Sequence, residues 1–114
     1  MNIKVVPDSI TLEELKEIAQ EFYFPLVKGV VDIEKKIVAF GGEYHADANN
    51  ILIESGSSQK DVWGFNVQLN QPRATWLEYT SLINIRPASG NRTIEVEDEV
   101  VRGKIKEIVD QKII

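Results

Sequence analysis

The chain has 114 residues, of which 43% are hydrophobic and 27% are charged, a balance that predicts one folded domain over residues 1–114 and excludes a disordered tail or a low-complexity linker. The 13 lysine and arginine residues against 18 acidic residues give a net charge of −5, so the surface repels nucleic acid and anionic lipid unless it holds a local basic patch. The absence of cysteine excludes disulfides, thiolate metal sites and a cysteine nucleophile.

The first residues do not have the pattern of a targeting signal. Pro7 and Asp8 come before any apolar stretch long enough for a secretory signal. Apolar runs elsewhere are only a few residues long, far below the roughly 20 needed to span a bilayer. We therefore expect a soluble, cytoplasmic protein that does not enter a membrane.

The first half of the chain predicts a strand, a helix and a hairpin. Thr11 and Glu14 have the spacing of a capping box at a helix start. Apolar residues then recur at helical spacing until Pro25 disfavours helical backbone. The elements expected are, in order, a strand at 3–6, a helix at 11–23, and hairpin strands at 27–33 and 37–40.

The second half predicts a short helix, two strands and a final helix. Asp47 is a suitable N-cap for the short helix. Alternation of apolar and polar residues is clearest in two segments joined by a connection that contains Pro72. Acidic residues at 97–99 favour a helix start there, because they complement the helix dipole. The elements expected are a helix at 47–55, strands at 63–69 and 76–86, and a helix at 98–112.

Together these elements predict an α+β fold, a single-domain two-layer sandwich of about four mostly antiparallel strands with three helices on one face. A shared core is expected on that face from Leu15, Ile18, Trp63, Phe65, Ile83, Ile85 and Ile105. The opposite face is expected to be polar and to need no cover. Its outward residues are Asn66, Gln68, Glu78, Thr80, Asn84 and Arg86.

His45 is the only histidine, and it lies between a glycine pair and the short helix. Its ordinary pKa suits general acid–base chemistry, with Glu43 or Asp47 to orient the ring. The alternative is structural: the glycines turn the chain, Asp47 caps the helix and His45 makes an internal hydrogen bond. One histidine with scattered carboxylates is a weak metal signal, so we expect neither a metal nor a cofactor.

Residues 84–93 carry a charge of +2 and no acid in an otherwise acidic chain. Their polar side chains include Asn84, Arg86, Asn91 and Arg92. Arginine forks and the backbone N–H groups of a glycine-containing loop suit phosphate or carboxylate. The alternative is structural: Arg86 pairs with Glu78 or another acid across the sheet, Arg92 pairs with acids at 95–99, and Gly90 only supplies a turn.

Three polar motifs together resemble the domain-of-unknown-function family 5674, a family of small prokaryotic proteins. The first motif is Gly-Gly-Glu-Tyr-His-Ala-Asp at 41–47, and the second is Gly-Ser at 56–57 followed by Asp-Val-Trp-Gly-Phe-Asn at 61–66. The third is Ile-Asn-Ile-Arg-Pro at 83–87 with Gly-Asn-Arg at 90–92. The likeness runs from the first helix to the last, and Thr93 keeps the hydroxyl of a serine in the family. The resemblance implies a compact stand-alone domain and carries over no activity.

Two functions fit these features, and the sequence leaves open whether the protein is an enzyme. The first is a binding or regulatory module that holds an anionic ligand or a protein partner. Its site would use the polar sheet face and the 84–93 loop, through Asn66, Glu78, Asn84, Arg86, Asn91 and Arg92. The second is a small hydrolase, acting on a phosphodiester such as RNA, with His45 as acid/base beside Glu43, and with Arg86 and Arg92 stabilising charge.

The two hypotheses differ in geometry, because the hydrolase needs its residues in one pocket. That pocket would bring together His45, Glu78, Arg86 and Arg92. A homodimer is also expected, since Ile113 and Ile114 are apolar and an open sheet edge pairs readily.

Overall fold

The computed structural model describes residues 1–114 as five strands, three α-helices and three short 3-10 helices. The strands are β1 (Lys4–Val6), β2 (Leu26–Asp32), β3 (Ile37–Phe40), β4 (Val62–Gln68) and β5 (Leu77–Glu78). The α-helices are α1 (Leu12–Ala19), α2 (His45–Glu54) and α3 (Glu99–Lys112). The 3-10 helices are η1 (Gln59–Asp61), η2 (Leu82–Asn84) and η3 (Pro87–Ser89). None of the helices has both the length and the apolar character required to cross a membrane.

All five strands form one antiparallel sheet in the order β1-β3-β2-β4-β5. The long central strands β2 and β4 pair along their whole length, and the edge strands are short. The predicted α+β single domain is thus confirmed, with one strand more than expected.

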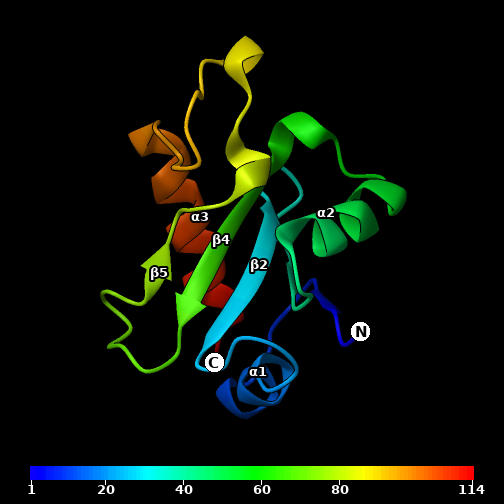
Figure 1. Ribbon diagram of the computed structural model, residues 1–114, viewed down its shortest axis with the longest axis vertical. Coiled ribbons are helices and arrows are strands. Elements are labelled where there is room, and N and C mark those ends of the chain that lie inside the picture. Colours follow the sequence, from blue (N-terminus) through cyan, green and yellow to red (C-terminus); the bar gives the residue numbers. More distant parts are fainter.

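The helices pack on both faces of the sheet, whereas the sequence predicted one face. Helices α1 and α3 cover the face that carries Trp63, Phe65 and Val67, and α3 passes behind β4 in Figure 1. Helix α2 covers the opposite face, where Ala48 and Leu52 pack. Their partners on that face are Val30, Ala39 and Val62.

The two-sided packing has a signal in the sequence of β2 and β3. Val30 and Val31 are adjacent and both fully buried, as are Val38 and Ala39. Adjacent strand residues point to opposite faces, so such pairs mark a strand that is covered on both sides. The prediction of an uncovered sheet face was based only on the alternation in the two strands expected at 63–69 and 76–86.

The predicted core is confirmed for Leu15, Ile18, Trp63, Phe65 and Ile105, which lie in one cluster. It is wrong for Ile83 and Ile85. Residue 85 is 43% exposed, and residue 83 packs on the α2 side. The expected strand at 76–86 stays in the sheet only over Leu77–Glu78, because the chain then turns into η2.

Ser81 is the residue at which this turn is made. Its hydroxyl accepts a hydrogen bond from the N–H of Ile83 at 3.2 Å, and its own N–H donates to the carbonyl of Ile94 at 2.9 Å. Gly64 on β4 allows the close approach, because a Cβ there would lie 2.5 Å from the Cβ of Ser81. The turn therefore packs directly on the sheet.

The predicted capping box is confirmed at the start of α1, and α3 starts at the acidic residues as predicted. Thr11 and Glu14 form the capping box of α1, with the Thr11 hydroxyl accepting from the Glu14 N–H at 3.1 Å. Asp98 caps α3 by accepting from the N–H groups of Val100 and Val101. Helix α1 ends at Ala19, earlier than predicted.

The C-terminal residues pack against the N-terminal part of the chain and form hydrogen bonds with it. Ile113 forms a parallel bridge with Ile10 and is 2% exposed. The guanidinium of Arg73 donates to the carbonyl of Ile113 at 3.0 Å. Of the two apolar residues that suggested a homodimer, only Ile114 is therefore at the surface, and the dimer stays a prediction.

Candidate functional site

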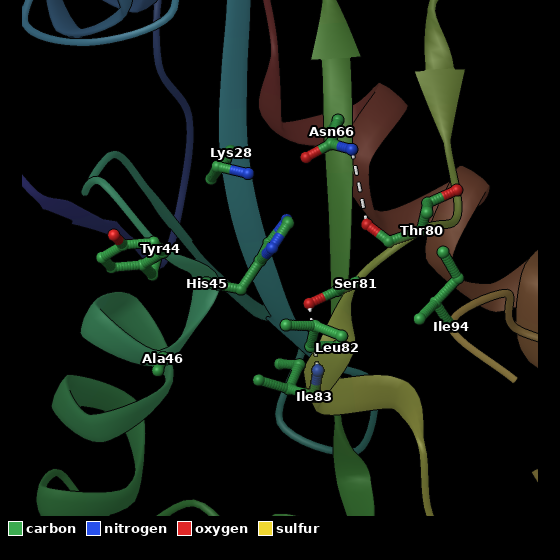
Figure 2. Close-up of a pocket in the computed structure, with 10 residues that line it drawn as sticks. All are labelled: Lys28, Tyr44, His45, Ala46, Asn66, Thr80, Ser81, Leu82, Ile83 and Ile94. Atoms are coloured by element: carbon green, nitrogen blue, oxygen red, sulfur yellow. Dashed lines mark hydrogen bonds between the residues drawn. The ribbon is translucent and has the colours of Figure 1, made fainter. Parts of the chain in front are cut away.

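A cavity of about 400 Å³ lies on the α2 face of the sheet (Figure 2). Strands β2 and β4 form its floor, the start of α2 forms one wall, and residues 80–83 with Ile94 form the other. Its lining residues are Lys28, Tyr44, His45, Ala46, Asn66, Thr80, Ser81, Leu82, Ile83 and Ile94. The volume is within the range of small-molecule sites.

Local backbone chemistry places His45 at the first position of α2. Gly41 and Gly42 turn the chain out of β3 with φ values of 115° and 95°, which glycine adopts without steric cost. The Asp47 carboxylate then accepts from the N–H groups of Glu43 at 3.1 Å and Tyr44 at 3.0 Å. Asp47 thus secures the helix start from within its first turn, although the N-cap itself is Tyr44 and not Asp47 as expected.

His45 is neutral in the folded protein near pH 7. Its Nε2 lies 2.8 Å from the carbonyl oxygen of Phe65, and a carbonyl only accepts, so Nε2 carries the proton and Nδ1 has a free lone pair. Burial lowers the pKa of His45 to about 4, although the Phe65 carbonyl and the Asn66 side chain favour the charged form. A pKa so far below neutrality suits a hydrogen-bonding residue better than an acid–base catalyst.

The protein is expected to lose stability on acidification because of this one histidine. The unfolded chain binds the proton near pH 6.5 and the folded chain near pH 4, so stability rises with pH between these values. Urea unfolding at neutral pH and at about pH 4 should show a loss of roughly 3 kcal/mol from His45. His45→Gln should lack this component while keeping the contribution of the carboxylates. An equal loss in the variant and the wild type would contradict the prediction.

Asn66 lies opposite Lys28 in the register of β4 and β2 and is 8% exposed. Its Nδ2 faces the Glu78 carboxylate and the Thr80 carbonyl, each at 3.4 Å. Its Oδ1 is buried and has no hydrogen-bond partner. In Figure 2 this oxygen is turned toward the side of Lys28 and the nitrogen toward Thr80. Asn66 is the one predicted ligand-binding residue that lines the cavity.

Asn84 is fully buried and bonds the outer edge of β4. Its Oδ1 accepts from the Gly64 N–H at 2.8 Å, and its Nδ2 donates to the Gly64 carbonyl at 3.0 Å and to the Ile94 carbonyl at 3.2 Å. The side chain therefore takes the place of a neighbouring strand at Gly64. Its polar atoms are used within the chain, which favours the structural alternative.

Asn91 has the same kind of internal role. Its Nδ2 donates to three backbone carbonyls, and its Oδ1 accepts from the N–H of Glu97 at 2.8 Å. The three carbonyls belong to Asn84, Thr93 and Glu95. Asn91 thus holds the 84–93 loop in its folded shape.

Arg86 bonds backbone carbonyls and no acid, so the alternative in which it forms an ion pair with Glu78 or another acid is wrong. Its guanidinium donates to the carbonyls of Gln59 at 3.0 Å and Lys60 at 3.2 Å, and also to those of residues 62 and 83. It also stacks on the ring of Trp63, 4.1 Å from the centroid. Arg86 therefore links η1 and β4 to the 84–93 loop.

Arg92 differs from Arg86 because its side chain is exposed and makes no ion pair within 4.0 Å. Only its backbone N–H has a partner, the carboxylate of Glu97. This carboxylate also accepts from the N–H of Thr93 at 3.0 Å, and these backbone bonds lower the pKa of Glu97. The acidic residues near α3 thus contact the loop backbone rather than the Arg92 side chain.

Alanine substitutions of Arg86 and Arg92 are expected to differ in their effect on stability, because only the side chain of Arg86 makes polar contacts within the fold. Arg86→Ala removes the donor for several carbonyls and the stacking on Trp63, so it should lower the free energy of unfolding by about 2–3 kcal/mol. Arg92→Ala removes an exposed side chain and should change it by less than about 0.5 kcal/mol. Urea unfolding of both variants beside the wild type checks this. Equal losses of stability in the two variants would contradict the structural role of the Arg86 contacts.

The structure does not bring the four residues of the predicted hydrolase into one pocket. Of His45, Glu78, Arg86 and Arg92, only His45 lines the cavity. Arg86 borders a separate surface depression, and Glu43 is exposed outside the cavity.

Several cavity residues were not singled out from the sequence. Lys28 is the most informative, because it alternates outward in a predicted strand. Its position beside Asn66 depends on the pairing of β2 with β4, which local patterns do not specify. Tyr44 lies in the motif at 41–47 and Leu82 in the strand expected at 76–86, and nothing in either segment indicates that the side chain lines a cavity.

Comparison with known proteins places the chain by family alone. No curated protein and no solved structure matches it significantly. A family model matches residues 4–112, which is nearly the whole chain, and its description is "Protein of unknown function (DUF5674)". The chain therefore belongs to the DUF5674 family, as the polar motifs predicted.

Proposed function

We propose that this protein is a binding module that holds a small organic anion in the cavity between α2 and residues 80–83. The observation that carries this proposal is the charge of the lining. Lys28 is the only charged side chain among the ten lining residues, half of which are hydrophobic. A single cation among apolar walls favours an anionic ligand with an apolar body.

The 84–93 loop supports this site instead of contacting the ligand with its arginines. Asn84 donates to the carbonyl of Ile94, and Ile94 lines the cavity. Ser81 donates to the same carbonyl. The loop therefore fixes the wall that faces α2, and rigid walls reduce the entropy lost on binding.

Binding is preferred over hydrolysis because of the groups around His45. The cavity lining includes no carboxylate to orient His45. The hydroxyls of Thr80 and Ser81 bond Glu95 and the N–H of Ile83 instead of His45, so an activated nucleophile–base pair is not assembled there. The low pKa of His45 leaves the imidazole neutral and suited to accepting a hydrogen bond at Nδ1.

An NMR titration with benzoate and benzyl alcohol tests the proposal. Benzoate should shift the backbone amide signals of residues 45–46, 66 and 80–83. Lys28→Met should weaken benzoate binding about tenfold, the equivalent of one charge-assisted hydrogen bond, and should leave benzyl alcohol binding unchanged. Lys60→Met, at an exposed lysine outside the cavity, is the matched control. Benzoate shifts scattered over the surface, or equal binding by wild type and Lys28→Met, would refute an anion site.

A further inference from the structure

We infer that Tyr23 is a positioning residue of the cavity, because its ring holds the ammonium group of Lys28 beside the ligand without neutralising it. This inference rests on the proposed function and adds to the site a residue outside the cavity lining. It is based on the place of the Lys28 ammonium, on its lack of an ion pair, and on the carboxylates that lie near Tyr23.

The Lys28 ammonium lies between the Tyr23 ring and the cavity. Its Nζ is 5.0 Å from the centroid of the ring, within the range of cation–π contacts. Lys28 also lines the cavity, and in Figure 2 its nitrogen is turned toward His45. Burial is the main cause of the low pKa of His45, and the charge of Lys28 lowers this pKa further, as expected for an ammonium that faces the cavity. One side chain therefore contacts both Tyr23 and the site.

Lys28 makes no ion pair, although acidic residues are near. No carboxylate lies within 4.0 Å of its Nζ. Desolvation raises the pKa of Tyr23, and the charges of Glu43 and Asp47 raise it further, so both carboxylates are on this side of the molecule. The Asp47 carboxylate already accepts from two backbone N–H groups, at 3.1 and 3.0 Å. Glu43 is exposed, so it is the acid to which an unrestrained Lys28 would turn.

An aromatic ring differs from a carboxylate as a partner for this cation. A carboxylate would hold Lys28 but cancel its charge, whereas the ring face attracts the ammonium and stays neutral. The N–H groups of the ammonium that do not face the ring remain donors for an anion. Restraining a long, flexible side chain before the ligand arrives also reduces the entropy lost on binding. Tyr23 therefore increases the affinity for an anion without contacting it.

Titrations of Tyr23 variants with benzoate and benzyl alcohol test the inference, because only benzoate requires the charge of Lys28. Tyr23→Phe keeps the ring and should bind benzoate within about twofold of the wild type. Tyr23→Leu removes the ring and should weaken benzoate about two- to fivefold, the equivalent of one partly exposed cation–π contact. Tyr23→Glu should weaken benzoate about tenfold, because its carboxylate pairs with Lys28 and repels the anion. All three should bind benzyl alcohol as the wild type does.

The side-chain NMR signals of Lys28 report the stacking without any ligand. An aromatic ring current shifts protons above the ring face upfield, so the Hε protons of Lys28 should lie upfield of those of Lys60, which is exposed. The shift should persist in Tyr23→Phe and vanish in Tyr23→Leu. A purely structural role of Tyr23 would not link this signal to the affinity for benzoate.

Phe22→Leu is the matched control. Phe22 is 40% exposed, against 44% for Tyr23, and no cation lies over its ring. This substitution removes an aromatic ring of similar exposure from the neighbouring position. It should change neither the Lys28 signals nor the affinity for benzoate.

The outcomes separate this inference from the proposed function. Benzoate shifts at the cavity with equal affinities for the wild type and Tyr23→Leu would refute the positioning role and leave the anion site. Hε protons of Lys28 at the position of those of Lys60 would refute the stacking. Absence of cavity shifts with benzoate in the wild type would refute the proposed function and the role of Tyr23 together.

Discussion

Asn84→Ala is expected to lower the free energy of unfolding by roughly 2–6 kcal/mol, because it leaves the N–H and the carbonyl of Gly64 without partners in a buried site. The Asn84 side chain is 0% exposed and also bonds the Ile94 carbonyl. Urea unfolding measured by far-UV circular dichroism checks the value.

The control for this substitution is Asn50→Ala. Asn50 is exposed on α2, so the same chemical change should alter stability by less than about 0.5 kcal/mol. If the two alanine variants unfolded at the same urea concentration, the side chain of Asn84 would not act as the partner of β4.

Ile105→Ala is expected to cost roughly 2–5 kcal/mol, the range for truncating a buried isoleucine. Ile105 is 0% exposed and connects α3 with the core cluster that contains Leu15 and Phe65. The denaturation midpoint should fall while the m-value stays constant, since the folded and unfolded surfaces hardly change.

Val100→Ala on the same helix provides the comparison. Val100 is 67% exposed, so its truncation should leave the midpoint nearly unchanged. An Ile105→Ala midpoint equal to that of the wild type would refute the packing of α3 on the sheet.

Local signals in the sequence were sufficient for most elements of the fold. The capping box at Thr11 and Glu14 and the cap at Asp98 use partners within three residues of each other. The alternation in β4 and the apolar runs in β2 and β3 likewise depend on neighbouring residues. Such features depend on residues that are close together in the sequence, which is why the sequence predicts the elements that carry them.

The segment after β5 was mispredicted because its geometry depends on distant groups. The alternation from residue 76 to 86 is that of a strand, yet Asn84 bonds Gly64 twenty residues away and the chain leaves the sheet. A side-chain amide can replace a backbone partner without changing the hydrophobic pattern. The sequence pattern therefore does not indicate that the Asn84 side chain, and not a neighbouring strand, bonds β4 at Gly64.

The cavity was only partly predictable for a similar reason. Asn66 and His45 were recognised as polar residues near a sheet face and a helix start. Their proximity in the cavity depends on the pairing of β2 with β4 and on the packing of α2 against the sheet face opposite α1 and α3. Lys28 and Asn66 are 38 residues apart in the sequence, and no local pattern specifies that register.

The side chains along β4 also affect how the protein behaves in concentrated solution. Beyond the short β5, the outer edge of β4 is bonded by Asn84 at Gly64 and by Arg86 at Val62. An unbonded strand edge recruits strands from other molecules and starts aggregates. These two side chains therefore keep separate molecules from joining their sheets, and a variant that lost them would precipitate more readily even at temperatures where it stays folded.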